Sequence, residues 1–521
     1  MAIEKMMTPN EIELMGETPD LEVEVIADAD SAVEVEMDDG SVVINFGSPG
    51  LDDDLDAAMA DHNANLAEGI EDAMLESMAS ELVEDFDNDR ASRKEWATSY
   101  INGLDLLGMK IEDRSQPWQG ASGVYHPMLT EAVVRFQAQA MSELMPASGP
   151  VKSKIIGKMT PEKLKQSKRV ETELNYLITE EMPDYRNEME QMLFKLPMAG
   201  SAFKKIYFDP ITERPVSQFV PAEDLVVSYG ASNLRTAPRF THVMKKTPEE
   251  VLKLQVNGFY RDVELPEATR DVTDIEEKYN ELEGSEPTFS DDPRHTILEM
   301  HVDLDLPEPF DDIDGVALPY VVTVDKSSSI VLSIRRNWYE DDSKREKRMH
   351  VVHYPYLPGM GFYGTGLIHT LGGLTKSATS IMRQLIDAGT LSNLPAGFKA
   401  RGMRITGDNT PIMPGEFRDV DVPAGTIKDA IVPLPYKEPS SVLYSLLGNV
   451  VDEGRRIGAV GDIQVGDINA QAPVGTTLAL MERSMQVMSG IQAHLHAAMK
   501  QELRILARIV HDYMPAEYAY E

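Results

Sequence analysis

The segment from Pro358 to Met514 joins helical and loop patterns in an order that restricts the fold more than any other part of the chain. A glycine-rich loop leads into a helical pattern. Short β patterns divided by prolines follow over 395–439, and a second helical pattern covers 440–459. A loop of Gly, Asn, Gln and Ala at 461–475 precedes one long helix. Two helices that flank a small β module, with a loop before a final helix, suit a subunit that lines the inside of a ring.

The three helices expected in this segment carry different faces. The first, which reaches about Leu391, alternates small residues that allow close helix packing with large apolar ones. The small residues are Gly372, Gly373, Ser377 and Ser380, and the apolar ones are Leu371, Leu374, Ile381, Leu385 and Ile386. The apolar face of the second helix consists of Val442, Leu443, Leu446, Leu447 and Val450. The long helix, capped by Thr476 or Thr477, has the stripe Leu478, Met481, Met485, Met488, Leu495, Met499 and Leu506.

Length and composition set outer limits on the chain. Its 521 residues predict about two to four structural units rather than one core. Apolar residues make up 42% and occur only in short runs, so no transmembrane helix is expected. The N-terminus is acidic and lacks an apolar stretch, so no signal peptide is expected either. The absence of cysteine excludes disulfides, thiolate metal sites and thiol catalysis.

The net charge of −38 is concentrated at the N-terminus. Residues 1–90 contain 27 Asp and Glu but only two basic residues, Lys5 and Arg90. Their few apolar side chains predict a largely disordered acidic arm, with local order at an alternating run, 42–46, and an acidic helical stretch near 65–85. Continuous order is expected to begin near Arg90. The arm is interpreted either as a solvated segment or as one that docks on a basic partner.

The pattern between residues 90 and 355 changes from helical to strand-like near residue 200. Helices are expected over 90–110, 126–145, 161–196 and a segment that Thr247 caps and Pro248 begins. Strands are expected over 202–209, 219–229, 295–306, 318–326 and 329–339, the last three as an antiparallel meander. The acidic stretch 261–293 is expected to be a loop insertion. The chain is therefore predicted to have an α+β fold.

Three glycines of the loop match a motif of nucleotide-binding proteins. Gly359, Gly361 and Gly364 have the G-x-G-x-x-G spacing of dinucleotide-binding loops and precede a helix. However, Pro358 stands where a strand should enter the turn, and the helix leads into the proline-rich module rather than a parallel strand. No P-loop motif occurs in the chain. We therefore expect no nucleotide cofactor.

Other patterns of catalysis and metal binding are also lacking. His494 and His496 are two residues apart on a helix and point about 200° from each other, so they cannot share a metal ion. The acidic run 52–54 lacks the spacing of a calcium loop, and no serine lies in a Gly-x-Ser-x-Gly elbow. We therefore predict no catalytic residues, no metal and no cofactor, and expect that the protein is not an enzyme.

Six blocks of sequence, in the same order, resemble the portal proteins of tailed bacteriophages, in particular those of short-tailed phages. The blocks are PWQGASGVYHPMLTEAVVRFQAQAMSELMPASGPVK (117–152), AGSAFKKIYFDP (199–210), PGMGFYGTGLIHTLGG (358–373), RQLIDAGTLSNLPAGFKARG (383–402), PGEFRDVDVPAG (414–425) and APVGTTLALMER (472–483). The similarity extends over about 90–514, nearly all of the chain beyond the acidic arm.

The resemblance implies a portal-type subunit with a mixed α/β wing, a helical stem, a small β-containing clip and a long C-terminal helix directed towards the crown. The implied division is 1–89 arm, 90–365 wing, 366–392 and 441–460 stem helices, 393–440 clip, 461–475 tunnel loop and 476–521 long helix.

The resemblance also implies a homo-oligomeric ring, usually of about twelve subunits, at one vertex of the capsid. Double-stranded DNA would pass through its channel during packaging and ejection. The implied partners are the large terminase subunit, the head-to-tail adaptor, and the major capsid and scaffold proteins, with no membrane involved. The protein would be part of the virion and would assemble in the host cytoplasm.

Two groups of residues are candidates for these contacts. Gln464, Asn469 and Gln471 of the tunnel loop are expected to face DNA, because uncharged groups touch phosphates without binding them tightly. The clip is expected to dock the motor and adaptor, with a surface formed by Lys399, Arg401, Arg404 and Arg418.

Two alternative functions remain open from the sequence. A nucleotide-binding enzyme would use the glycines at 359–364 to hold phosphate, and nucleotide would then raise its melting temperature. Another virion structural protein, such as a scaffold or an adaptor, need not form a ring. The oligomeric state of the purified protein separates that alternative from a portal.

Overall fold

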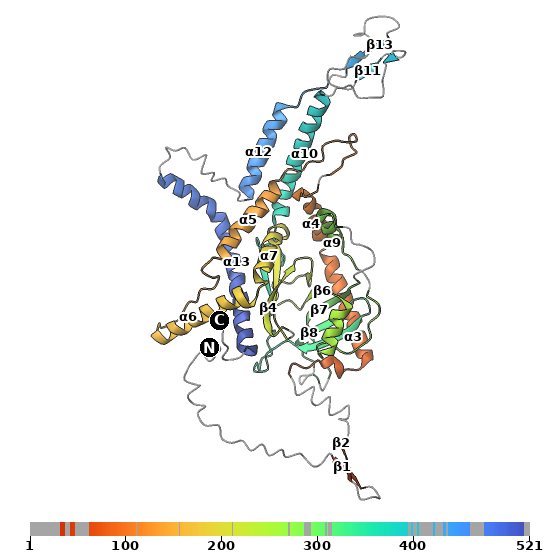
Figure 1. Cartoon of the computed structure of the whole chain (residues 1–521), viewed down its shortest axis with the longest axis vertical. Helices are drawn as coiled ribbons and strands as arrows, with labels where there is room; N and C mark the ends of the chain where they lie inside the picture. Colours follow the sequence, from red (N-terminus) through yellow and green to blue (C-terminus); the bar gives the residue numbers. More distant parts are fainter. Residues whose placement is uncertain are drawn as a thin grey trace. The chain divides into compact units, whose positions relative to one another are not determined.

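The computed structural model (Figure 1) describes most of the chain beyond Asp61. Complete residues are described over 62–110, 112–155, 157–210, 212–268, 271–285, 293–307, 310, 315–393, 436–458 and 490–514. The backbone alone is described over 32–36, 42–46, 397–399, 404–405, 420–421, 431–433 and 474–489.

The chain divides into two compact units, each built from separate segments. The first unit comprises Met1–Ile101, Val134–Gly366 and Met485–Glu521, and the second comprises Asn102–Val133 and Leu367–Ser484. These boundaries differ from the predicted wing, 90–365, because residues 102–133 group with the helices that follow Leu367. Helices and antiparallel sheets both occur, which confirms the α+β class.

The first unit contains a five-stranded antiparallel sheet in the order β5-β6-β7-β8-β9. Its strands are β5 (Leu225–Val227), β6 (Arg239–Lys246), β7 (His295–Leu304), β8 (Leu318–Asp325) and β9 (Ile330–Arg336). The predicted meander over the last three strands is confirmed: β7 pairs with β8, where Met300 lies opposite Val322, and β8 pairs with β9. Buried apolar side chains from these strands form the main core of the unit.

Residues 62–92 pack on this sheet, so the prediction that continuous order begins near Arg90 is wrong, whereas the helical stretch expected near 65–85 is confirmed. After a short 3-10 turn, η2 (Leu66–Glu68), helix α3 (Asp72–Ser92) follows. Its side chains in the core are Leu75, Ala79, Leu82 and Phe86. Their spacing of four, three and four residues places them on one face of the helix, which the average acidity of 1–90 concealed.

Polar contacts fix this N-terminal segment to the sheet as well. The buried Asn65 side chain donates to the carbonyl of Leu332 at 3.1 Å and accepts from the amide of Ile334 at 3.0 Å. Near the other end of α3, Asp89 accepts two hydrogen bonds from Arg239, at 2.7 and 3.1 Å. Part of the acidic charge of the segment is therefore paired within the fold.

A second, three-stranded antiparallel sheet of the first unit has the order β10-β3-β4. Its strands are β3 (Ser201–Asp209), β4 (Arg214–Pro221) and β10 (Val351–Pro355). The predicted strand 202–209 is confirmed, but the single strand predicted over 219–229 is wrong. The chain turns after Pro221, where the amide of Asp224 donates to the Pro221 carbonyl at 3.1 Å, and β5 then joins the other sheet.

Several predicted helices are confirmed. The segment 90–110 forms α4 (Lys94–Leu104) and a 3-10 turn, η3 (Asp105–Leu107), and 126–145 forms α5 (Met128–Leu144). All six side chains expected on the apolar face of α5 are buried: Met128, Leu129, Val133, Phe136, Ala140 and Leu144. Helix α8 (Pro248–Val256) starts at the predicted cap, where Thr247 and Glu250 form a capping box.

Two helix predictions need correction. The single helix expected over 161–196 is broken into α6 (Pro161–Tyr176), a π turn, η4 (Leu177–Glu181), and α7 (Tyr185–Ala199). Pro183 lies in the break, where the missing N–H and the ring disfavour a continuous helix. In addition, the stretch 261–293 is not all loop, because α9 (Asp274–Glu283) lies within it behind a capping box of Thr273 and Glu276.

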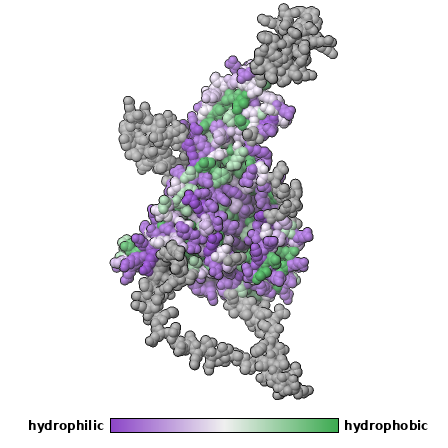
Figure 2. Space-filling model, in the orientation of Figure 1, coloured by the Kyte–Doolittle hydropathy of each residue, from purple (hydrophilic) through white to green (hydrophobic). Residues whose placement is uncertain are grey.

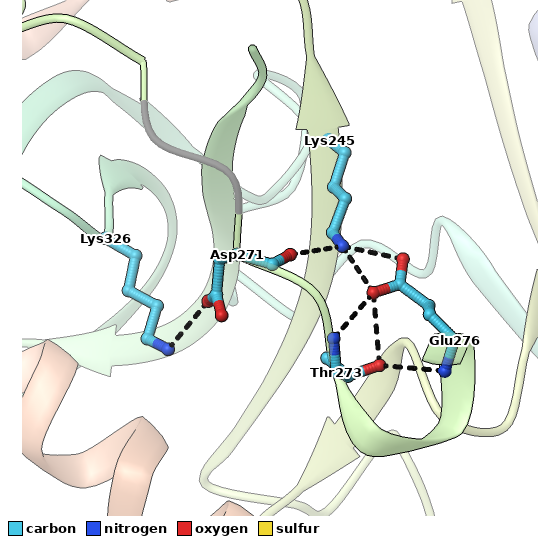
Figure 3. A network of polar contacts seen from close by, with 5 residues as sticks. All are labelled: Lys245, Asp271, Thr273, Glu276 and Lys326. Carbon is cyan, nitrogen blue, oxygen red and sulfur yellow. Dashed lines mark hydrogen bonds and ion pairs between the residues drawn. The ribbon is translucent and has the colours of Figure 1, made fainter. Parts of the chain in front are cut away.

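Helix α9 is held at the sheet by a network of charged groups (Figure 3). The Nζ atom of Lys245 on β6 donates to Glu276 Oε1 at 2.6 Å and to the Asp271 carbonyl at 2.6 Å. Lys326, just after β8, donates to Asp271 Oδ2 at 3.4 Å. The same carboxylate of Glu276 therefore completes the helix cap and pairs with the sheet.

The C-terminal helix α13 (Val474–Tyr513) begins earlier than predicted. Thr476 and Thr477 lie inside the helix rather than at its cap, and the predicted loop 461–475 overlaps its first turn. Side chains are described from residue 490 onward, and there the predicted positions Leu495, Met499 and Leu506 are buried. The positions of the stripe from 478 to 488 lie outside the described side chains.

A buried ion pair joins α13 to the three-stranded sheet. Lys204 Nζ on β3 lies 3.2 Å from Glu502 Oε1, and both side chains are 0% exposed. Ser217 on β4 donates to the same oxygen at 2.6 Å, and the hydroxyl of Tyr354 on β10 donates to Oε2. Burial lowers the pKa of Lys204, and the charge of Glu502 opposes that shift.

The second unit is organised around two helices, α10 (Leu367–Asn393) and α12 (Ser441–Ile457), as predicted. Between them the backbone forms two small antiparallel pairs. These are β11 (Gly397–Lys399) with β14 (Ile431–Pro433), and β12 (Arg404–Ile405) with β13 (Val420–Asp421). The side chain of Ser440 caps α12 by accepting from the Leu443 amide at 3.5 Å.

Candidate functional site: the paired helices and the glycine-rich loop

Helices α10 and α12 lie side by side, and the apolar surface of α12 is only partly covered (Figure 1). Of the predicted apolar face, Leu443, Leu447 and Val450 are half-buried. Val442 and Leu446, in contrast, are 74% and 45% exposed. The predicted face is thus wider than the area that α10 can cover within one chain.

The uncovered residues form an apolar surface on the helix pair, which we call the α12 stripe. Its members are Val442, Leu446 and Ile457, which lie within about 60° of one another around the helix axis. Figure 2 shows hydrophobic colour on this helix pair between hydrophilic regions. Large apolar side chains that stay exposed together in one chain mark a surface used for protein contacts. Ile457 lies on the predicted face but about two turns beyond Val450, and it was not among the predicted residues. Tyr444 is also exposed, but it points about 200° away from Val442 and is not part of the stripe.

The block 112–127 holds α10 through polar contacts. Arg383 donates to Glu112 Oε2 and to the Val124 carbonyl, both at 2.8 Å, and its guanidinium lies 4.4 Å from the centre of the Tyr125 ring. Asp387, one turn later, accepts from the Ser122 amide at 2.8 Å. These residues carry part of the portal resemblance, and in the structure they position a helix.

Arg383 and Asp387 were missed as candidate positions in the sequence. The signal that could have found them is an Arg–Asp pair four residues apart in an otherwise small and apolar helix. A nearby contact supports the same arrangement, since Arg455 Nη2 on α12 lies 3.5 Å from Glu131 Oε2 on α5. The helix pair is therefore fixed by charged side chains on one side and leaves the α12 stripe open.

The glycine-rich loop 356–366 belongs to the first unit, and its glycines allow close contact between backbones. A Cβ atom at Gly364 would lie 2.2 Å from the carbonyl oxygen of Gly200, and one at Gly366 would lie 2.2 Å from that of Met198. Gly200 itself has a φ of +85° and would clash with Gly364 in return. Glycine is required at these positions because two chain segments cross there.

This packing gives the G-x-G-x-x-G spacing a structural explanation. A Cβ at Gly359 would lie 2.0 Å from the Tyr363 carbonyl oxygen, whereas Gly361 has open space around its Cα. All strand pairs among the described residues are antiparallel, unlike the parallel βαβ unit in which this motif binds dinucleotides. The loop is thus a crossing point of the backbone.

Tyr363 connects this loop to strand β5 of the five-stranded sheet. The Tyr363 hydroxyl donates to the Leu225 carbonyl at 3.0 Å and accepts from Arg93 at 3.1 Å. Arg93 also donates to the carbonyls of Ala222 and Leu225, at 2.7 and 3.0 Å. One arginine therefore ties the end of α3 to the loop and to the turn between the sheets.

The residues predicted to contact DNA or docking partners lie largely outside the described part. Gln464, Asn469 and Gln471 are outside it, as are Arg401 and Arg418. Lys399 lies in β11 and Arg404 in β12, where only the backbone is described. Their roles stay predictions.

Among the described residues, no group of three or more His, Asp or Glu side chains is placed to hold a metal ion. His496 instead lies 3.2 Å from Glu143 Oε1 on α5. In the same part of the chain, no helix has the length and apolar character needed to cross a membrane.

Comparison with known proteins places the chain in a family. A family model described as "Phage SU10 portal protein" matches residues 133–464, more than half of the chain. A search of curated proteins gave no match. The matched region includes the glycine-rich loop, α10 and α12, and it overlaps five of the six blocks that carry the resemblance. The chain therefore belongs to the portal protein family represented by phage SU10.

Proposed function

We propose that copies of this chain form a closed ring at one vertex of a phage capsid, through which double-stranded DNA is packaged and ejected. The observation that carries the proposal is the uncovered α12 stripe on a chain of the portal family. In a closed ring every copy makes the same contact with each of its two neighbours. The exposed apolar surface of each copy is therefore covered by the next copy, and no copy is left with that surface exposed.

Within this proposal, each segment keeps the role that the sequence suggested. The first unit forms the wing and carries the C-terminal part of α13 towards the crown, while α10 and α12 form the stem. The segment 393–440 is the clip, and 461–475 is the tunnel loop, with Gln464, Asn469 and Gln471 facing DNA. The net charge of −38 favours the sliding of DNA through the channel. A channel with few Lys and Arg side chains near the phosphates binds DNA weakly.

The proposed partners follow from the position of the ring. The clip, with Lys399, Arg401, Arg404 and Arg418, would dock the large terminase subunit during packaging and the head-to-tail adaptor afterwards. The wing would contact the major capsid and scaffold proteins. The ring, with about twelve subunits, would thus be a structural component of the virion without catalytic activity.

Introducing charge into the α12 stripe is expected to prevent ring formation. In the variant Val442→Asp/Leu446→Asp, two carboxylates would have to be buried without partners, which costs several kcal/mol per interface. Mass photometry at matched protein concentration is expected to show subunits or small oligomers in place of rings.

The matched control is Leu252→Asp/Val256→Asp on α8. These two side chains are 58% and 79% exposed and are likewise four residues apart on a helix, but they lie in the first unit. This control is expected to form rings as the unmodified chain does. Normal rings in the α12 variant would refute the assigned interface.

A further inference from the structure

A segment with a strong excess of positive charge lies between α5 and the end of α6 in this acidic protein. Residues 150–170 hold seven Lys and Arg but one acidic residue, Glu162, in a chain of net charge −38. The basic residues are Lys152, Lys154, Lys158, Lys163, Lys165, Lys168 and Arg169, and all seven are exposed. No ion pair joins any of the six lysines to a carboxylate of the described residues.

Hydrogen bonds join the two parts of this segment into one rigid element. Asn175 of α6 accepts from the Val151 amide at 3.0 Å and donates to the Val151 carbonyl at 3.1 Å. Glu171 accepts from the amide and the hydroxyl of Ser153, at 3.0 and 2.8 Å. These bonds hold residues 151–153 against α6, and the described residues of 151–176 are here called the basic platform, which projects from the first unit (Figure 1).

Glu171 supplies only limited compensation for the lysines. The hydrogen bonds from Ser153 lower its pKa, and the charges of Lys152 and Lys168 add to this effect. The platform contains two further carboxylates, Glu162 and Glu173, so seven basic residues stand against three acidic ones. The platform also has apolar side chains at its free end, since Met159 is 74% and Leu164 55% exposed. Figure 2 shows this hydrophobic spot among hydrophilic surface.

The chain itself contains a segment with the complementary chemistry. Residues 20–46 hold nine Asp and Glu and no Lys or Arg, and the acidic residues alternate with Leu, Val, Ile and Ala. Within it, β1 (Ala32–Glu36) pairs with β2 (Val42–Phe46), so that Glu34 is the register partner of Ile44 and Glu36 of Val42. Among the described strands these two pair only with each other. A two-stranded hairpin is marginally stable alone in water and gains from a surface to pack on.

We infer that the acidic segment 20–46, which contains the paired strands β1 and β2, docks on the basic platform of its own or a neighbouring copy. The 16 residues from Phe46 to His62, where the described fold resumes, span up to about 50 Å when extended. Tethering gives the segment a high effective concentration at the platform, so contacts that are individually weak add up. Duplex DNA is the less suitable occupant, because phosphates gain nothing from Met159 and Leu164. This inference does not depend on the ring proposed above.

Zero-length carbodiimide crosslinking of the intact chain, followed by mass spectrometry, tests the contact. Amide crosslinks from carboxylates of 20–46 are expected at the six platform lysines, at least about tenfold more abundant than at Lys253 and Lys376, which are exposed elsewhere. They are expected to disappear at 0.5 M salt, because surface charges are screened over about 3–5 Å there. Crosslinks from 20–46 to Lys253 and Lys376 that are as abundant as those to the platform lysines would overturn the proposal.

Hydrogen exchange gives a second readout that does not need the lysine amines. In Lys152→Gln/Lys154→Gln/Lys168→Gln, amides of 32–46 are expected to exchange at least about fivefold faster than in the unmodified chain. The control Lys253→Gln is expected to leave them unchanged. If the triple variant keeps the slow exchange but binds duplex DNA less, the platform is a nucleic-acid surface and the inference is wrong.

Discussion

Replacing Glu502 by alanine is expected to lower the free energy of unfolding of the first unit by about 3–5 kcal/mol. The substitution leaves Lys204 fully buried without its counter-charge, and it removes the acceptor of Ser217 and Tyr354. The loss would be measured by urea denaturation at matched protein concentration, because assembly also stabilises the folded chain. The substitution would also remove part of the contact between α13 and the three-stranded sheet.

Two further variants separate the ion pair from a general loss of packing. Lys204→Met/Glu502→Leu removes both charges and is expected to be more stable than Glu502→Ala, because no unpaired charge remains buried. Glu453→Ala removes the partner of Arg456 on the surface of α12, where the two side chains are 54% and 77% exposed, and is expected to change little. A Glu502→Ala protein as stable as the Glu453→Ala protein would contradict the account.

Lowering the pH from 7 to 5 is expected to remove about 4 kcal/mol of stability through two buried histidines. Burial lowers the pKa of His242 to about 3 and that of His353 to about 4. An unfolded histidine has a pKa of about 6.5, so below that pH the unfolded chain takes up protons that the folded chain does not. Stability therefore falls as the pH drops from about 6.5 towards 4, by about 2 kcal/mol for each histidine at pH 5.

Other buried groups act on the same pH range. Burial also lowers the pKa of His301 and of His350, which adds to the loss. Asp224 acts in the opposite direction, since burial raises its pKa to about 7 and the folded chain takes up a proton there as the pH falls. Comparing the variant His242→Leu/His353→Phe with the unmodified chain cancels these shared contributions.

The measurement is urea denaturation of both proteins at pH 7 and pH 5. The variant is expected to lose about 4 kcal/mol less between the two pH values, whatever its stability at pH 7. An equal loss in both proteins would show that these two histidines do not remain neutral in the folded chain at pH 5.

The elements predicted correctly from the sequence are those with strong local signals. Helix α5 has six apolar residues on one face, α8 has a complete capping box, and β7 to β9 are rich in β-branched residues. In such segments local preference and tertiary packing agree. For α10, the small and apolar periodicity predicted the helix, whereas three of its four small residues, Gly373, Ser377 and Ser380, are exposed in the single chain.

The errors arose where the average charge of a long region hid a local pattern, or where contacts between distant segments decided the structure. A helical stretch near 65–85 was expected, but the acidity of 1–90 concealed that its apolar residues from Leu75 to Phe86 belong to the core. The run 219–229 has β character throughout, but its two halves join different sheets. Pairing with strands elsewhere in the chain decides which sheet each half joins. Residues far apart in sequence are joined by the hydrogen bonds of Arg93 and by the ion pair of Lys204 with Glu502. Sequence periodicity does not reveal such contacts.

The candidate surface was predicted only in part. The apolar face of α12 followed from spacing, but the division of that face into covered and uncovered halves depends on how much of it α10 covers. The glycine requirement at Gly364 and Gly366 likewise depends on the segment from Met198 to Gly200, which lies more than 150 residues earlier in the chain.

Electron microscopy of the purified intact chain tests the central proposal most directly. Class averages are expected to show closed rings of about twelve subunits, with the α12 stripe of each copy covered by the next copy. Because the buried surface is apolar, the rings should persist at high salt. A chain that stays monomeric or dimeric at all concentrations and salt conditions would contradict the proposal.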